Sequence, residues 1–96
     1  MEILVAYDVA TDTAAGRKRL RKVAAACLAY GQRVQQSVFE CSVTDAQLAQ
    51  LEHRLLGCIR PEEDSLRFYR LVEPRERHVR VYGRDQRIDL TAPLIL

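Results

Sequence analysis

The first thirty residues combine a strand-length apolar run with an amphipathic helical pattern. Residues 3–7 are continuously apolar, which is typical of a central strand covered on one or both faces. The Thr-Asp-Thr sequence at residues 11–13 then offers side-chain oxygens that can cap a helix. Apolar residues follow at helical spacing, namely Leu20, Val23, Ala24, Cys27 and Leu28. Because Gly31 suits the position after a helix end, these features predict a strand followed by a helix over about residues 13–30.

The next third of the chain has strand character and then a second helical pattern. Residues 33–43 are rich in β-forming side chains, but their alternation breaks at residues 35–37. The segment is therefore either one bent strand or two short strands, and the pattern does not decide between them. Thr44 and Gln47 have the form of a capping box, which predicts a helix that Gly57 closes.

The last third contains three segments with strand character. Residues 66–71 form one predicted strand after an acidic loop at residues 62–64, and residues 79–82 alternate as a second. Residues 88–96 are too apolar for a free tail, so we expect them to pair as a strand in this chain or on a partner subunit. The order of elements predicts an α+β sandwich of the ferredoxin-like type, with a βαββαβ core and an extra C-terminal strand.

The length of 96 residues predicts a single domain. A chain of this size buries roughly 60 to 65% of its unfolded surface, so a catalytic cleft is expected between subunits rather than inside one. No signal peptide or apolar stretch of about 20 residues is recognisable, and we expect a soluble, cytoplasmic protein without membrane contact. The three cysteines, at positions 27, 41 and 58, are odd in number and widely spaced, which argues against a disulfide scaffold or a zinc module. Cys27 falls on the apolar face of the first helical pattern, and we assign no cysteine a catalytic role.

The net charge of +2 conceals a strongly basic segment. Residues 13–44 contain six basic residues and one acidic residue. Five of the basic residues cluster on the predicted first helix and form a basic patch, namely Arg17, Lys18, Arg19, Arg21 and Lys22. The patch is either an ordinary solvated helix face or a phosphate-binding surface. The absence of acids at helical spacing favours the second, because bound phosphates would relieve the repulsion between the cations.

Asp8 is a carboxylate placed directly at the carboxyl end of the first predicted strand. Such a group should cap the following helix, pair with a cation or bind a metal ion. One carboxylate alone holds Mg²⁺ poorly, but two copies of Asp8 across a dimer axis could share one hydrated ion. Ser37, in the Gln-Gln-Ser sequence at residues 35–37, either hydrogen-bonds a backbone group or lies on an exposed strand face.

Several segments together resemble one protein family. They are Tyr7-Asp8-Val9, Arg17 to Val23, Gly31 to Cys41, Phe68 to Leu71, and Val79 to Gly83. These segments are similar to CRISPR-associated protein 2, the small subunit of the bacterial spacer-acquisition complex. The resemblance spans nearly the whole chain without a large insertion, and the segment from Gly31 to Glu40 is its most specific part.

The resemblance implies a ferredoxin-like homodimer in which residues 88–96 pair with the partner's sheet. In the family, the aspartate at the place of Asp8 faces its symmetry mate and is taken as the ligand of Mg²⁺ or Mn²⁺. Members are described as metal-dependent endonucleases that act on single-stranded RNA or double-stranded DNA. The implied mechanism is attack of a metal-bound water on a phosphodiester.

The resemblance also implies macromolecular partners. Two dimers of the CRISPR-associated integrase subunit flank the central dimer in a heterohexamer, and the central dimer acts as a ruler for duplex DNA. Basic residues on the family's first helix contact that DNA. The matching positions here are Arg17, Lys18, Arg21 and Lys22, and Arg33 is a further predicted nucleic-acid contact.

Two functions therefore compete. In the first, the protein is a nuclease in which Asp8 binds the metal and Arg33 or Ser37 positions the phosphate. In the second, it is a non-catalytic DNA-binding scaffold in which Asp8 serves the dimer interface and the basic patch carries the function. One carboxylate per subunit is few for phosphodiester hydrolysis, which favours the scaffold. A sensor of a small anionic metabolite is a third alternative, disfavoured by the lack of a glycine-rich phosphate loop.

Overall fold

The computed structural model describes residues 1–84 and shows the element order β-α-β-β-α-β followed by a short helix. The elements are β1 (Glu2–Asp8), α1 (Ala14–Leu28), β2 (Gly31–Gln35), β3 (Val38–Ser42), α2 (Asp45–Leu56), β4 (Ser65–Leu71) and α3 (Arg75–His78). This order confirms the predicted α+β sandwich of the ferredoxin-like type. Among the described residues, no helix is long and apolar enough to cross a membrane.

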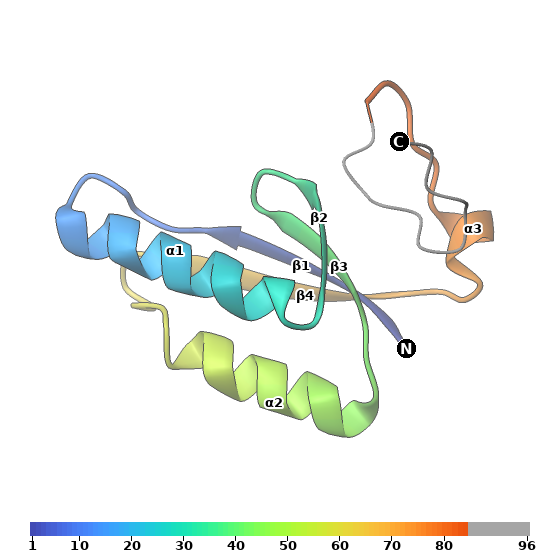
Figure 1. Cartoon of the computed structure of the whole chain (residues 1–96), viewed down its shortest axis with the longest axis horizontal. Coiled ribbons are helices and arrows are strands. Elements are labelled where there is room, and N and C mark those ends of the chain that lie inside the picture. The colour runs from blue at the N-terminus through green and yellow to red at the C-terminus, as the bar shows by residue number, and fades with distance from the viewer. Residues whose placement is uncertain (85–96) are drawn as a thin grey trace, which may run out of the picture.

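The four strands form one sheet in the order β2-β3-β1-β4, and all neighbouring strands are antiparallel. β1 is a central strand, which explains its continuous apolar run. Its odd-numbered residues Ile3, Val5 and Tyr7 are buried. They face α1 and α2, which lie along the same side of the sheet (Figure 1). Because side chains alternate along a strand, the even-numbered residues, including Asp8, point to the opposite face.

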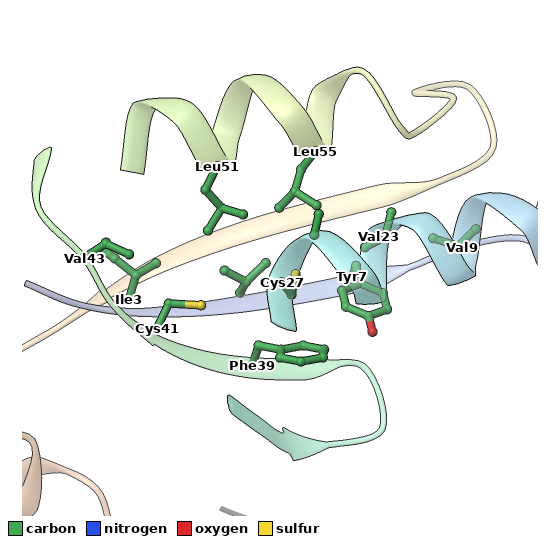
Figure 2. Packing of buried hydrophobic residues seen from close by; sticks show 12 residues of the cluster. Ile3, Tyr7, Val9, Val23, Cys27, Phe39, Cys41, Val43, Leu51 and Leu55 are labelled. Carbon is green, nitrogen blue, oxygen red and sulfur yellow. The ribbon is translucent and has the colours of Figure 1, made fainter. Parts of the chain in front are cut away.

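The core lies between the two long helices and the sheet. Phe39 on β3 is fully buried and stacks on Tyr7, with 6.2 Å between the ring centroids. Figure 2 shows Leu51 and Leu55 extending from α2 toward the strands, while α1 contributes Cys27 from its inner face. One apolar layer therefore holds both helices on the sheet, and the exposed face of α1 remains available for other contacts.

The caps of the helices agree closely with the predicted signals. The hydroxyl of Thr13 accepts a hydrogen bond from the amide of Gly16 at 3.0 Å, which begins α1. At α2, Thr44 and Gln47 form the predicted capping box, and Gly57 is the C-cap residue. The sequence can predict such caps because a cap depends on residues only three or four positions apart.

The prediction that Gly31 ends the first helix is wrong. α1 ends at Leu28 with Ala29 as its C-cap, and Gly31 is the first residue of β2. A Cβ atom at Gly31 would lie 2.2 Å from the carbonyl oxygen of Glu40 and 2.7 Å from the Cα atom of Cys41. The glycine is therefore required by the close approach of β2 to β3. The segment at residues 33–43 contains two short strands, which are joined by a turn at residues 36–37.

Replacing Gly31 with alanine should lower the free energy of unfolding by about 2 to 3 kcal/mol, because a rigid backbone would have to move to admit the methyl group. Gly57→Ala is the matched control. A Cβ there would have its nearest neighbours at 3.5 Å and 3.7 Å, and the backbone is already helical. The control should change stability by less than about 1 kcal/mol. Urea unfolding followed by circular dichroism measures both, and equal midpoints would contradict this account.

A second difference from the sequence-based prediction concerns the chain after β4. Residues 79–82 do not form the predicted strand in the described part of the chain, where α3 precedes them and they pair with no strand. Val79 has an extended backbone, with φ of −119° and ψ of 125°, but a strand also needs a neighbour. Tyr82 is 84% exposed, so its apolar ring has little cover. The predicted strand at residues 88–96 lies outside the described residues.

Candidate functional site

Asp8 ends β1 and its side chain is exposed. Ser65 of β4 lies opposite it in the strand register. Within residues 1–84, the Asp8 carboxylate makes no hydrogen bond or ion pair, and the cap of α1 is supplied by Thr13 instead. Of the three roles considered for Asp8, helix capping and internal ion pairing are therefore not observed in this part of the chain.

A metal ion at Asp8 would have few protein ligands from one subunit. Among the described residues, no group of three or more histidine, cysteine, aspartate or glutamate side chains could hold a metal ion. Mg²⁺ commonly keeps several water ligands and takes one or two carboxylates together with substrate phosphates. An exposed carboxylate without a partner fits that mode, and it does not fit a closed site built by one chain.

Four cations of α1 face solvent. They are Arg17, Lys18, Arg21 and Lys22, and none of them forms an ion pair within residues 1–84. The guanidinium of Arg17 donates to the carbonyl oxygen of Thr11 at 3.2 Å, which leaves its other donors available. The predicted surface of uncompensated positive charge is thus present on the outer face of α1.

Arg19 differs from the other members of the basic patch. Its Nε donates to Oδ2 of Asp64 at 2.9 Å, and its Nη2 donates to the carboxylate of Glu63 at 3.2 Å. The Asp64 side chain is fully buried, and its bond with Arg19 lowers the pKa of the carboxyl group. The acids that neutralise Arg19 lie far from it in sequence, so helical spacing could not reveal them. The sequence places Asp64 only in an acidic loop.

Ser37 lies beside the end of β1. It belongs to the turn between β2 and β3, and its backbone oxygen accepts a hydrogen bond from the amide of Tyr7 at 3.1 Å. The structure therefore brings Ser37 next to the residue that precedes Asp8. This proximity depends on the sheet order, because about thirty residues separate the two positions.

Arg33 occupies the helix-covered face of the sheet. Its guanidinium carbon lies 5.2 Å from the centroid of the Phe39 ring, and its Nε is buried without a hydrogen-bond partner. Burial raises the pKa of Tyr7, and a hydrogen bond with Arg33 opposes that effect. Because Asp8 points to the other face, the structure does not place Arg33 and Asp8 on one surface of a single chain.

The buried cysteines are poor nucleophiles. Burial raises the pKa of Cys27 to about 12 and that of Cys41 to about 11. Both are thus thiols near neutral pH, whereas nucleophilic attack requires the thiolate. The chemistry available at the surface is that of Asp8, Ser37 and the exposed cations.

Comparison with known proteins decides the family. The family described as CRISPR associated protein Cas2 matches residues 1–79. A curated relative from Moorella thermoacetica, named CRISPR-associated endoribonuclease Cas2 1, is 59% identical over 96 residues and is covered completely, as is this chain. This chain belongs to the Cas2 family. A second Cas2 relative, from Halalkalibacterium halodurans, is named CRISPR-associated endonuclease Cas2 and is 52% identical, with 99% of each chain covered.

Solved Cas2 structures agree with the fold. The crystal structure of Streptococcus pyogenes Cas2 at pH 6.5 has a TM-score of 0.79 and 55% identity, covering 86% of this chain and all of that chain. A partial Cas6-RT-Cas1–Cas2 complex contains a chain with a TM-score of 0.68 and 30% identity, covering 99% of this chain and 98% of that one. The sandwich described above is therefore the Cas2 fold.

Proposed function

We propose that this Cas2 chain acts in CRISPR spacer acquisition as a homodimer that binds duplex nucleic acid and cleaves phosphodiester bonds with the help of Mg²⁺ or Mn²⁺. The observation that carries the proposal is the exposed Asp8 carboxylate, which has no partner within residues 1–84. The endonuclease and endoribonuclease names of its relatives support a hydrolytic reaction. The substrate class is single-stranded RNA or double-stranded DNA.

In this proposal Asp8 holds the ion together with the same residue of the partner subunit. A bound divalent ion would neutralise charge on the phosphodiester and activate water for attack. Ser37, fixed beside Tyr7 by a backbone hydrogen bond, would orient the phosphate near Asp8. Arg33 lies on the other face of the sheet, over the Phe39 ring, so Ser37 is the candidate for phosphate positioning near Asp8 within one chain.

Dimerisation would use the face of the sheet that α1 and α2 leave open. Val81 is 48% exposed and Tyr82 is 84% exposed, and this segment lines a cavity of about 260 Å³ with Leu4 and Val38 of the open face. A partner subunit on that face would cover these apolar groups and bring the two copies of Asp8 toward one axis. The apolar residues 88–96 would add a strand to the partner's sheet.

Deleting residues 88–96 should raise the dissociation constant of the dimer at least about tenfold, which corresponds to about 1.4 kcal/mol. The lost apolar contacts and backbone pairing between subunits are the physical reason. Sedimentation velocity over a concentration series measures the change. Thr44→Ala is a useful control, because it removes the cap of α2 and lowers stability by about 1 kcal/mol without altering the tail. An unchanged sedimentation profile after truncation would argue against strand exchange.

The integrase partner is part of the same proposal. The structural similarity to a chain of a Cas6-RT-Cas1–Cas2 complex supports a role in which integrase dimers flank the Cas2 dimer in a heterohexamer. Such a complex would act in the cytoplasm, where its DNA substrate and the CRISPR array meet. The chemistry of integration would then belong to the integrase subunit, whatever nuclease activity Cas2 has.

A non-catalytic scaffold is the second candidate function. Two observations favour it: the exposed cations of α1, and the absence of a three-ligand metal group within residues 1–84. Four cations per subunit on one helix face would bind phosphates by charge and would release counterions, so binding would weaken steeply with salt. In this alternative Asp8 contributes only to the dimer interface.

The test is cleavage of labelled single-stranded RNA and duplex DNA by the full chain, with binding recorded in parallel. Cutting that requires Mg²⁺ or Mn²⁺ and stops with a chelator would support the nuclease. Salt-sensitive duplex binding without any cutting in the presence of either metal would instead assign the scaffold function.

A further inference from the structure

The backbone that follows Asp8 is held by contacts from two sides. The amide of Ala10 donates a hydrogen bond to Oδ1 of Asp64 at 3.1 Å. On its other side, the first turn of α1 approaches so closely that a Cβ atom at Gly16 would lie 1.9 Å from the carbonyl oxygen of Ala10. Ala10 therefore has little freedom to move, although it lies in the connection between β1 and α1.

Asp64 joins three parts of the chain through one carboxylate. Besides the Ala10 amide, it accepts hydrogen bonds from the backbone amide of Arg60 at 2.9 Å and from Nε of Arg19 at 2.9 Å. The Asp64 side chain is fully buried, and that of Arg19 is 12% exposed. A buried carboxylate with this number of donors is fully satisfied and stays ionised, because the Arg19 guanidinium lowers its pKa.

The position of Asp64 in the sheet connects it to Asp8. Ser65, the next residue, is the register partner of Asp8 at the end of the pairing between β1 and β4. Asp64 is thus close to Asp8 along two segments of the chain. It precedes Ser65, which lies opposite Asp8 on β4, and it accepts a hydrogen bond from the amide of Ala10, two residues after Asp8. Its contacts do not include the Asp8 carboxylate.

We propose that Asp64, oriented by Arg19, is a positioning residue that fixes the strand end and loop from which Asp8 presents its carboxylate. The proposal rests on the proposed metal site at Asp8 and adds a residue that never touches the ion or the nucleic acid. Residues that orient metal ligands from outside the coordination sphere commonly change metal affinity by about 10- to 100-fold when they are replaced. A shared ion at a dimer axis is sensitive to such orientation, because each subunit contributes one carboxylate.

Asp64→Asn is the most informative variant. It preserves the shape of the side chain, and its Oδ1 can still accept from Ala10, but its Nδ2 would face two donors, the amide of Arg60 and the guanidinium of Arg19. Arg19→Lys is a milder second variant that keeps the charge and loses the fork-shaped contact. Leu51→Ala is the control, because it removes a fully buried core side chain of α2 and destabilises the fold without touching this network.

Two measurements on the full-length dimer separate positioning from general destabilisation. Amide hydrogen exchange reports the protection of Ala10, and Mn²⁺ titration followed by NMR line broadening at Asp8 and Val9 reports metal affinity. For Asp64→Asn we expect exchange at Ala10 to accelerate by about tenfold relative to other loop amides, and Mn²⁺ affinity to fall by about 10-fold or more. Arg19→Lys should give smaller shifts of the same sign, and Leu51→Ala should give neither local change.

The outcomes distinguish this proposal from the metal site itself. Absence of Mn²⁺ broadening at Asp8 in the wild type would overturn the metal site, and exchange at Ala10 would still decide whether Asp64 fixes the loop. Unchanged Ala10 exchange in both network variants would overturn the positioning role. Normal Mn²⁺ affinity in a folded Asp64→Asn protein would do so as well.

Discussion

Asp8→Asn is expected to reduce the proposed metal-dependent cleavage by about 100- to 1,000-fold, which corresponds to about 3 to 4 kcal/mol of transition-state stabilisation. The amide has the shape of the carboxylate but not its charge, so it would bind Mg²⁺ weakly. Because the Asp8 side chain is exposed and makes no hydrogen bond or ion pair within residues 1–84, the free energy of unfolding should change by less than about 0.5 kcal/mol.

The expected loss is therefore separable from a folding defect. Initial rates of cleavage at saturating Mg²⁺ and Mn²⁺ give the effect on the reaction, and duplex affinity should stay within about twofold because the cations of α1 are unchanged. Asp12→Asn is the matched control: the same chemical change, at an exposed residue four positions along the chain. Equal activity of wild type and Asp8→Asn would assign the cutting to another site or to a contaminant.

Reversing the charge of the four exposed cations of α1 should abolish duplex binding, with a loss of affinity of at least about 1,000-fold. The variant combines Arg17→Glu, Lys18→Glu, Arg21→Glu and Lys22→Glu. If each cation neutralises one phosphate, the slope of log affinity against log salt should also become shallower by about 3.6 per subunit. The fold should survive, because the four side chains are exposed, form no ion pair within residues 1–84, and are replaced by glutamate, which favours helices.

A pair of double variants separates a local contact from the effect of overall charge. Arg21→Glu with Lys22→Glu should weaken duplex binding by at least about tenfold more than Arg54→Glu with Arg70→Glu, which alters exposed residues elsewhere by the same total charge. Fluorescence anisotropy at several salt concentrations measures affinity and slope, and sedimentation checks that the proposed dimer persists. Equal losses in the two double variants would show that the basic face of α1 is not the binding surface.

These predictions depend on features that differ in how far the sequence reveals them. Arg17, Lys18, Arg21 and Lys22 lie on the outer face of α1 as their helical spacing predicts. Arg19 belongs to the same basic cluster of α1, but its side chain is largely buried. Asp64, in the loop before β4, pairs with it. A helical pattern describes which residues share a face, and it contains no information about which acid a later loop will bring there.

Elements whose signals are local can be predicted from the sequence alone. Residues a few positions apart predict the apolar run of β1, the caps at Thr13 and Thr44, and the exposed cations of α1. The family is evident from the match over residues 1–79 and from a relative that is similar over all 96 residues. The close approach of Gly31 to β3 and the position of Ser37 next to Tyr7 depend instead on how distant segments pack in the fold.

The Asp64 network and the unpaired state of residues 79–82 within the described chain also depend on the tertiary structure. The carboxylate of Asp64 joins Ala10, Arg19 and Arg60, of which only Arg60 is close to it in sequence. Residues 79–82 have the alternation of a strand but find no strand to pair with in the described chain. The physical reason is common to both: propensity and capping act along the chain, whereas buried charge pairing, close strand approach and strand partnership depend on which distant segments the sheet brings together.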